Sequence, residues 1–70
     1  MMKYVIWGAA HRGRLLYELL GKERIAAYID SDPVKREKNF HGFPVIDYAT
    51  YKERYREYAV IITMVFGGGV

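Results

Sequence analysis

The chain contains no cysteine, and this absence excludes disulfide bonds and thiolate-bound metal ions. It also lacks a long apolar run, because its longest stretch without a charged residue, residues 58–70, contains three glycines and is too short to cross a bilayer. No positively charged start is followed by the long apolar segment of a secretory signal. We therefore expect a cytoplasmic protein with no membrane span.

Charge of one sign is not concentrated anywhere in the chain. Eleven Lys and Arg residues against eight Asp and Glu give a formal charge of +3, and the two signs alternate, as in residues 52–57. This mixture is typical of a solvated surface, so we expect no nucleic-acid partner. A hydrophobic content of 51% in 70 residues predicts one globular domain, residues 1–70.

Apolar runs and helical periodicities alternate along the chain. We expect strands at residues 3–7, Ile25–Ile29 and residues 59–63, and helices at residues 12–20 and 48–57. Asp47 is the expected N-cap of the second helix, and Pro33 is expected to begin a short helical turn over residues 34–37. The predicted sheet-facing residues of the two helices are Leu15, Leu16, Leu19 and Leu20, and Tyr48, Tyr51, Tyr55 and Tyr58.

This alternation predicts an α/β fold of Rossmann-like type, a partial doubly wound parallel sheet of about three strands in the order 2-1-3. A complete domain of this type has about five or six strands. We therefore expect the 70 residues to be a fragment of a larger protein. The predicted strand at residues 59–63 would then be an open edge, available to a homodimer or to a further domain.

The segment between the first strand and the first helix fits a phosphate-binding turn. Residues 8–13, GAAHRG, match G-x-G-x-x-G with alanine at the second glycine. Gly8 permits the tight turn, Ala10 occupies the point where the backbone approaches a pyrophosphate, and Gly13 lets the helix pack closely on the sheet. Arg12 is suited to pair with a phosphate oxygen. The alternative is a tight turn that holds no nucleotide.

Asp30 lies 22 residues beyond Gly8, at the end of the second strand. A carboxylate there can accept hydrogen bonds from both ribose hydroxyls of NAD, and it repels a 2′-phosphate. Lys35 and Arg36 are the alternative signal, because cations beyond this strand can receive a 2′-phosphate. The cofactor expected from these residues is NAD.

Other candidate groups carry weaker signals. Histidine is a common general base, but no orienting partner accompanies His11, so no catalytic residue or metal site is assigned. The glycines at residues 67–69 either line the pocket or form a flexible end. We expect the tyrosine stripe to pack against the sheet as core rather than to form a base-stacking platform.

Three segments carry a family resemblance: GAAHRGR at residues 8–14, YIDSDP at residues 28–33 and HGFPVI at residues 41–46. They are similar to the G-A-G-x-x-G-R or G-A-G-G-H-G turn, the F-I-D-D-D-P strand end and the I-x-G-x-P-V piece of the N-terminal Rossmann-like domain of bacterial polysaccharide-biosynthesis proteins. These include nucleotide-sugar epimerases/dehydratases and sugar acyltransferases of the bacillosamine and sialic acid type. The chain departs at Ala10, and His11 stands one position earlier than the histidine of the family.

The resemblance implies that the turn and Asp30 face a nucleotide, a UDP-sugar in the acyltransferases, and that catalysis belongs to later domains. The resulting hypothesis is a nucleotide-binding module, for NAD or a nucleotide-sugar, of a larger surface-polysaccharide protein. An NAD-dependent oxidoreductase fragment and a non-binding structural or dimerisation domain are the alternatives. The sequence leaves the reaction and the choice among NAD, NADP and nucleotide-sugar open.

Overall fold

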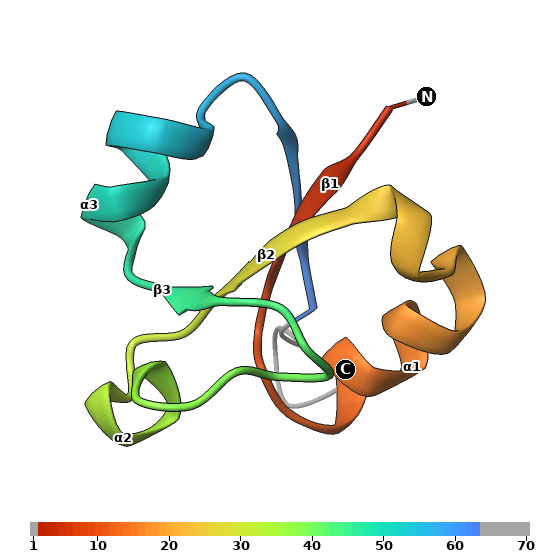
Figure 1. Ribbon diagram of the computed structural model, residues 1–70, viewed down its shortest axis with the longest axis horizontal. Helices are drawn as coiled ribbons and strands as arrows, with labels where there is room; N and C mark the ends of the chain where they lie inside the picture. Colours follow the sequence, from red (N-terminus) through yellow and green to blue (C-terminus); the bar gives the residue numbers. More distant parts are fainter. Residues whose placement is uncertain (1, 64–70) are drawn as a thin grey trace, which may run out of the picture.

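A parallel sheet of four strands forms the centre of the computed structural model, which describes residues 2–63. The strands are β1 (Tyr4–Trp7), β2 (Ile25–Ile29), β3 (Val45–Ile46) and β4 (Ala59–Ile62), in the order β3-β2-β1-β4. The helices are α1 (His11–Leu20), α2 (Pro33–Arg36) and α3 (Tyr48–Thr50), with a 3₁₀ turn at Lys22–Arg24 and a π-helical turn at Tyr51–Tyr55. Figure 1 shows α1 and α3 on opposite sides of the strands.

The predicted parallel α/β fold is confirmed, and the predicted order 2-1-3 is found as β2-β1-β4. The sheet has four strands where about three were predicted, because β3 adds a strand beside β2. Two residues are too short to produce a periodic pattern, and the strand is defined by its partner: Asp30 donates its N–H to the Ile46 carbonyl at 3.0 Å. The complete order is that of the first four strands of a dinucleotide-binding sheet.

Alternation along β1 places its neighbouring side chains on opposite faces of the sheet. Ile6 is fully buried in the cluster that Leu16 and Leu20 of α1 cover. Trp7, the next residue, stacks instead on Tyr48 of α3, with 5.1 Å between ring centroids. The central strands are therefore covered on one face by α1 and on the other by α3.

The predicted leucine stripe of α1 is only half correct. Leu16 and Leu20 pack on the core, whereas Leu15 and Leu19 are 50% and 79% exposed. The reason is the position of α1 over the middle of the sheet, which leaves the edge strand β4 beside a groove of about 330 Å³. Arg12, Leu15, Leu16, Ile61, Ile62 and Thr63 line this α1–β4 groove.

The predicted helix at residues 48–57 is a single turn of α-helix followed by the π-helical turn. Its four tyrosines are not core residues: Tyr48 is 46% exposed, and the other three are partly buried. The Tyr51 hydroxyl donates to the Tyr58 carbonyl at 2.9 Å, across the wide turn. The stripe is a half-exposed aromatic cover rather than part of the core.

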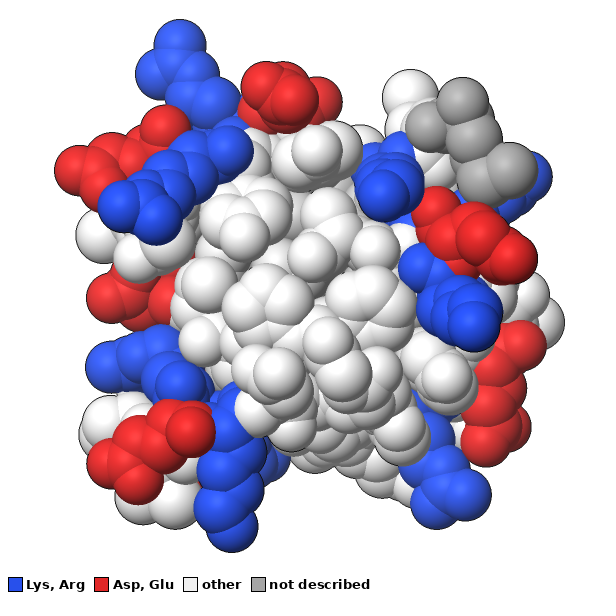
Figure 2. Space-filling model, in the orientation of Figure 1, with Lys and Arg blue, Asp and Glu red and all other residues white. Residues whose placement is uncertain are grey.

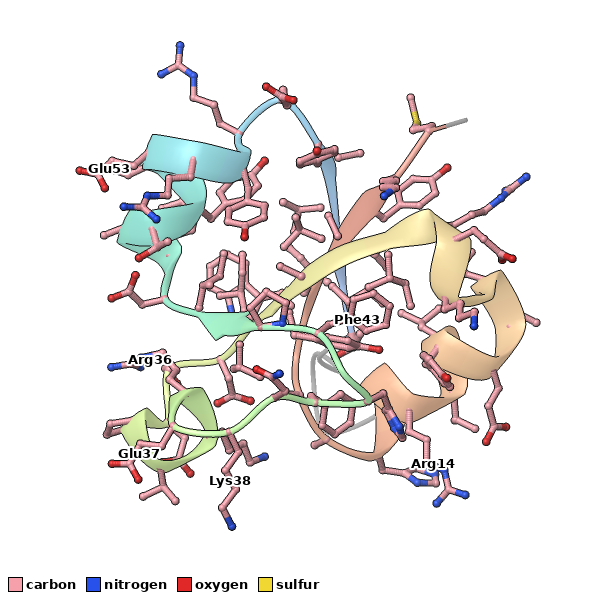
Figure 3. All side chains as sticks on the ribbon, viewed as in Figure 1. Arg14, Arg36, Glu37, Lys38, Phe43 and Glu53 are labelled. Carbon is pink, nitrogen blue, oxygen red and sulfur yellow. The ribbon has the colours of Figure 1, made fainter. Side chains whose placement is uncertain are left out.

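On the face drawn in Figure 2, charged side chains form no patch of one sign. Figure 2 shows basic and acidic residues interspersed around the rim of one face. In Figure 3, Phe43 lies in the middle of the molecule, where it packs on the core, whereas Arg14 and Lys38 lie at its periphery. Within residues 2–63, no helix is long and apolar enough to cross a bilayer.

Candidate functional site

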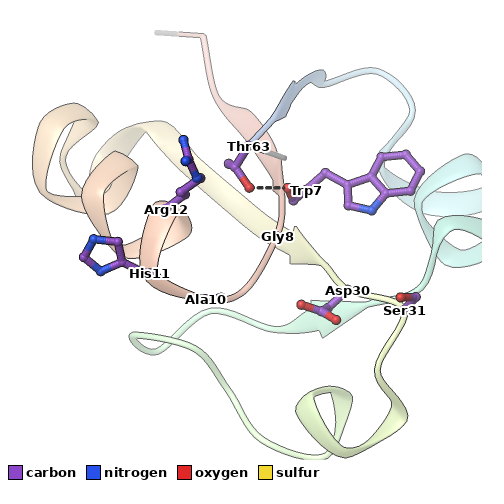
Figure 4. Close-up of a pocket in the computed structure, with 8 residues that line it drawn as sticks. All are labelled: Trp7, Gly8, Ala10, His11, Arg12, Asp30, Ser31 and Thr63. Carbon is purple, nitrogen blue, oxygen red and sulfur yellow. Dashed lines mark hydrogen bonds between the residues drawn. The ribbon is translucent and has the colours of Figure 1, made fainter. Parts of the chain in front are cut away.

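The carboxyl ends of three strands meet at a pocket of about 400 Å³ (Figure 4). Its lining residues are Trp7, Gly8, Ala10, His11, Arg12, Asp30, Ser31 and Thr63. The pocket lies where the chain leaves β1 toward β2 on one side, while β4 flanks β1 on the other. This is the topological switch point, the position at which open α/β sheets bind ligands.

Gly8 makes the sharp exit from β1 that the sequence predicts. Its φ of +131° is strained for any residue with a side chain, and an added Cβ would collide with the Thr63 hydroxyl. Hydrogen bonds hold the turn on both sides. Gly8 donates its N–H to the Ile29 carbonyl at 2.7 Å, and Thr63 donates its hydroxyl to the Trp7 carbonyl at 2.8 Å. Neighbouring strands thus hold the floor of the pocket.

Gly13 brings the first turn of α1 into contact with that floor. It is the buried residue of α1, and a Cβ at this position would collide with the Gly8 carbonyl and meet the Tyr28 ring at 3.0 Å. The buried Tyr28 hydroxyl donates to the Gly13 carbonyl at 3.1 Å. Burial raises the pKa of Tyr28 to about 12, which keeps this donor protonated.

The start of α1 carries no cap from a side chain. Ala10 is the N-cap residue in an extended conformation, and the first turn contains no acidic residue. Among residues 2–63, no acceptor bonds the N–H groups of His11, Arg12 or Gly13. A helix start whose N–H groups have no hydrogen-bond acceptor attracts anions, because the free donors and the helix dipole both favour negative charge.

Asp30 joins the turn to the loop that follows β2. One carboxylate oxygen accepts from Ala9 N–H at 3.0 Å, and the other accepts from Asp32 N–H at 2.9 Å. Lys35 Nζ lies 3.8 Å from the same carboxylate, whose side chain is 15% exposed. A carboxylate has about four lone-pair sites, so Asp30 retains acceptor capacity toward the pocket. The sequence does not reveal its two bonds to the main chain.

The cations beyond β2 have partners within the protein. The Arg36 guanidinium donates to the carbonyls of Asp30 and Ser31, at 3.2 and 3.0 Å. Lys35 pairs with Asp30 and lines a separate pocket of about 240 Å³ together with Lys38. Neither Lys35 nor Arg36 lines the switch-point pocket.

The structure brings every predicted site residue to one place. Gly8, Ala10, His11, Arg12 and Asp30 line the pocket, and Gly13 lies directly beneath it. The predicted glycines at residues 67–69 lie outside the described residues. His41 lies elsewhere, stacked on the Tyr17 ring, and within residues 2–63 no three potential ligands gather around a metal site.

Three lining residues were missed by the sequence reasoning: Trp7, Ser31 and Thr63. Each ends a strand or closely follows one. The rule that parallel strands present their carboxyl ends at a shared edge could have found them, since these are the positions that meet there.

Comparison of the chain with family models, curated proteins and solved structures finds no match. The function is therefore inferred from the site.

Proposed function

We propose that the protein is a nucleotide-binding module. The phosphates lie at the start of α1, and the ribose hydroxyls bond to Asp30. The observation that carries the proposal is the uncapped start of a ten-residue helix, open to a pocket at the switch point of the sheet. Arg12 is exposed at the same end and supplies a cation for a phosphate oxygen.

The ligand we propose is NAD or a nucleotide-sugar rather than NADP. Asp30 repels a 2′-phosphate, and Lys35 and Arg36, the cations that could receive one, already contact Asp30. The resemblance of the turn, the YIDSDP segment and the HGFPVI segment to polysaccharide-biosynthesis proteins supports the nucleotide-sugar. A place for the module within a larger protein of that kind is part of the proposal.

Titration calorimetry with NAD, NADP and UDP-N-acetylglucosamine tests this proposal. We expect NAD or the UDP-sugar to bind more tightly than NADP. The Arg12→Gln variant should weaken binding roughly fivefold, because an exposed ion pair contributes up to about 1 kcal/mol. Arg14→Gln is the matched control, since Arg14 lies in the same helix but pairs with Glu18 at 3.3 Å. Absence of heat from all three ligands at millimolar concentration would refute nucleotide binding, and equal losses in both variants would refute the role of Arg12.

A second role is favoured by the exposed apolar surface next to β4. We propose that this edge pairs with a second copy of the chain. Ile62 is 51% exposed and lines the α1–β4 groove together with Leu15, and the Ala59–Ile62 strand carries no charge that would discourage pairing. A two-fold axis would place the two β4 strands antiparallel and cover both apolar surfaces.

Sedimentation equilibrium over a range of concentrations tests the association. We expect a dimer that Leu15→Lys dissociates, because Leu15 is 50% exposed and lines the groove beside β4. Val34→Lys is the control, because Val34 is a 62% exposed apolar residue on α2, away from the edge. A monomer at every concentration, or dissociation by both variants alike, would contradict the dimer.

A further inference from the structure

Trp7 is the one tryptophan of the chain and forms one end of the switch-point pocket. It is the last residue of β1, immediately before the turn at Gly8. Its ring stacks on Tyr48 with an interplanar angle of 24°, yet it also belongs to the pocket wall. Tyr48 therefore packs against the indole, while Trp7 is also a lining residue of the pocket.

The pocket runs across the edge of the sheet from α1 to Trp7. Trp7 lies on the face of the sheet opposite to α1, because it alternates with Ile6. In Figure 4, His11 and Arg12 lie at one end of the pocket, the Trp7 ring lies at the other, and Asp30 lies between them. A nucleotide with its phosphate at α1 and its ribose at Asp30 would direct its base toward Trp7.

The indole is held in place before any ligand binds. Tyr48 also stacks on Tyr51 with 5.9 Å between centroids, and Lys52 Nζ lies 5.3 Å from the centroid of the Tyr48 ring. A ring fixed by such a stack loses little conformational entropy on binding. Large planar surfaces of this kind bind bases of any sequence, because every base has a π-face.

We infer that Trp7 is a stacking residue for the heteroaromatic base of the nucleotide, a role that rests on the proposed function. Stacking strength follows the area of the ring, so the site should favour a purine over a pyrimidine and therefore, of the two proposed ligands, NAD over a UDP-sugar. Trp7 thereby determines specificity at the base, while α1 and Asp30 bind the parts that all nucleotides share.

Fluorescence and NMR of Trp7 test this inference with three probes: ADP, UDP and inorganic pyrophosphate. We expect ADP to quench the Trp7 emission and shift its indole N–H resonance, and UDP to do so more weakly. Pyrophosphate should shift the amides of His11 and Arg12 without changing the indole. ADP should bind more than about tenfold more tightly than pyrophosphate, because one stacked base contributes about tenfold and the ribose bonds to Asp30 add to it.

Substitutions separate stacking from folding. Trp7→Leu should reduce the advantage of ADP over pyrophosphate about tenfold and leave the part that the ribose contributes at Asp30, and Trp7→Phe should reduce it less, with both affinities measured by calorimetry. Tyr55→Leu is the control, because Tyr55 contacts Tyr58 at the other end of the tyrosine stripe. It should change neither affinity. The pyrophosphate affinity of each variant reports whether the turn is still folded.

The outcomes distinguish this inference from the proposal on which it rests. Binding of pyrophosphate and ADP with equal affinity and an unchanged indole would overturn the role of Trp7 and leave the phosphate site intact. Perturbation of the indole by UDP-N-acetylglucosamine but not by UDP would assign the ring to a sugar and also overturn it. Failure of all probes to bind would overturn the nucleotide site itself.

Discussion

The helices of this protein begin in two different ways. At α2 the Asp32 carboxylate accepts from Val34 N–H at 3.0 Å, and at α3 the Asp47 carboxylate accepts from Thr50 N–H at 2.8 Å. At α1 the equivalent position is Ala10, which has no polar side chain. The longest helix of the described chain is thus the one that lacks a cap.

This difference follows the location of each helix start. The starts of α2 and α3 do not line the switch-point pocket, and there the protein satisfies its own donors. The start of α1 lines that pocket, and there the N–H groups of the first turn have no acceptor within residues 2–63. N–H groups without an acceptor weaken a helix, since an N-cap typically contributes about 1 kcal/mol to stability. Their retention at this one position is what a binding site for an anion requires.

Contacts behind the first turn hold α1 in place of a cap. Gly13 packs against the Gly8 carbonyl, and Tyr28 donates its hydroxyl to Gly13. Ala9, the residue before the N-cap position, donates its N–H to the Asp30 carboxylate at the end of β2. If these contacts replace the cap, their removal should harm the protein more than removal of a cap at α2 or α3.

The largest effect is expected from Gly13→Ala. The new Cβ would overlap the backbone of Gly8, so the protein should lose about 3 kcal/mol of unfolding free energy. That is a large part of the few kcal/mol available to so small a domain. Gly42→Ala is the control: φ is +85° but nothing lies within 4 Å of the new Cβ, so the expected loss is about 1 kcal/mol. Urea unfolding measures both, and equal losses would contradict the close packing.

Tyr28→Phe should cost about 1 kcal/mol, the contribution of one buried hydrogen bond. The variant should also change how the free energy of unfolding falls at alkaline pH. Because the pKa of Tyr28 is raised from 10.0 to about 12 in the folded state, the unfolded chain releases this proton first, and stability falls as pH rises between those values. Urea unfolding at a series of alkaline pH values should show a shallower fall in Tyr28→Phe, and an identical slope would contradict the buried hydroxyl.

Asp47→Ala should have a smaller effect, confined to α3. Hydrogen bonds from Thr50 hold the pKa of Asp47 below its ordinary value, with the side-chain bond as the larger cause and the N–H bond as the next. A lowered carboxyl pKa contributes stability above the unfolded pKa and loses it as pH falls through the folded value. Acid unfolding of Asp47→Ala should therefore converge on that of the parent chain at low pH. A difference that persists there would show that the substitution acts through packing instead.

The sequence predicted those features that depend on local patterns. The Ile25–Ile29 strand has the predicted bounds, because a continuous apolar run between polar residues is a strong strand signal. Asp47 is the predicted N-cap, and Pro33 begins the predicted turn. Each of these features rests on residues adjacent to one another in the chain.

Features that depend on distant partners were not predictable. The β3 strand is recognised by its pairing with β2, and the exposure of Leu15 and Leu19 depends on where α1 lies across the sheet. Trp7 was predicted as a strand residue, and its stacking on Tyr48, 41 residues away, depends on how α3 packs against the sheet. The turn that carries the site was predictable from adjacent residues, whereas the residues that complete the pocket follow only from the rule that parallel strands share a carboxyl edge.

The most direct test of the account adds the missing cap. Ala10→Asp should stabilise the free protein by about 0.5 to 1 kcal/mol, since its carboxylate would accept from the first turn of α1. It should also abolish the pyrophosphate-induced shifts of the His11, Arg12 and Gly13 amides in NMR titrations, because the added charge would occupy the same donors. Higher stability together with lost binding is the predicted result. Undiminished pyrophosphate binding in the stabilised variant would contradict the claim that α1 is left uncapped for a ligand.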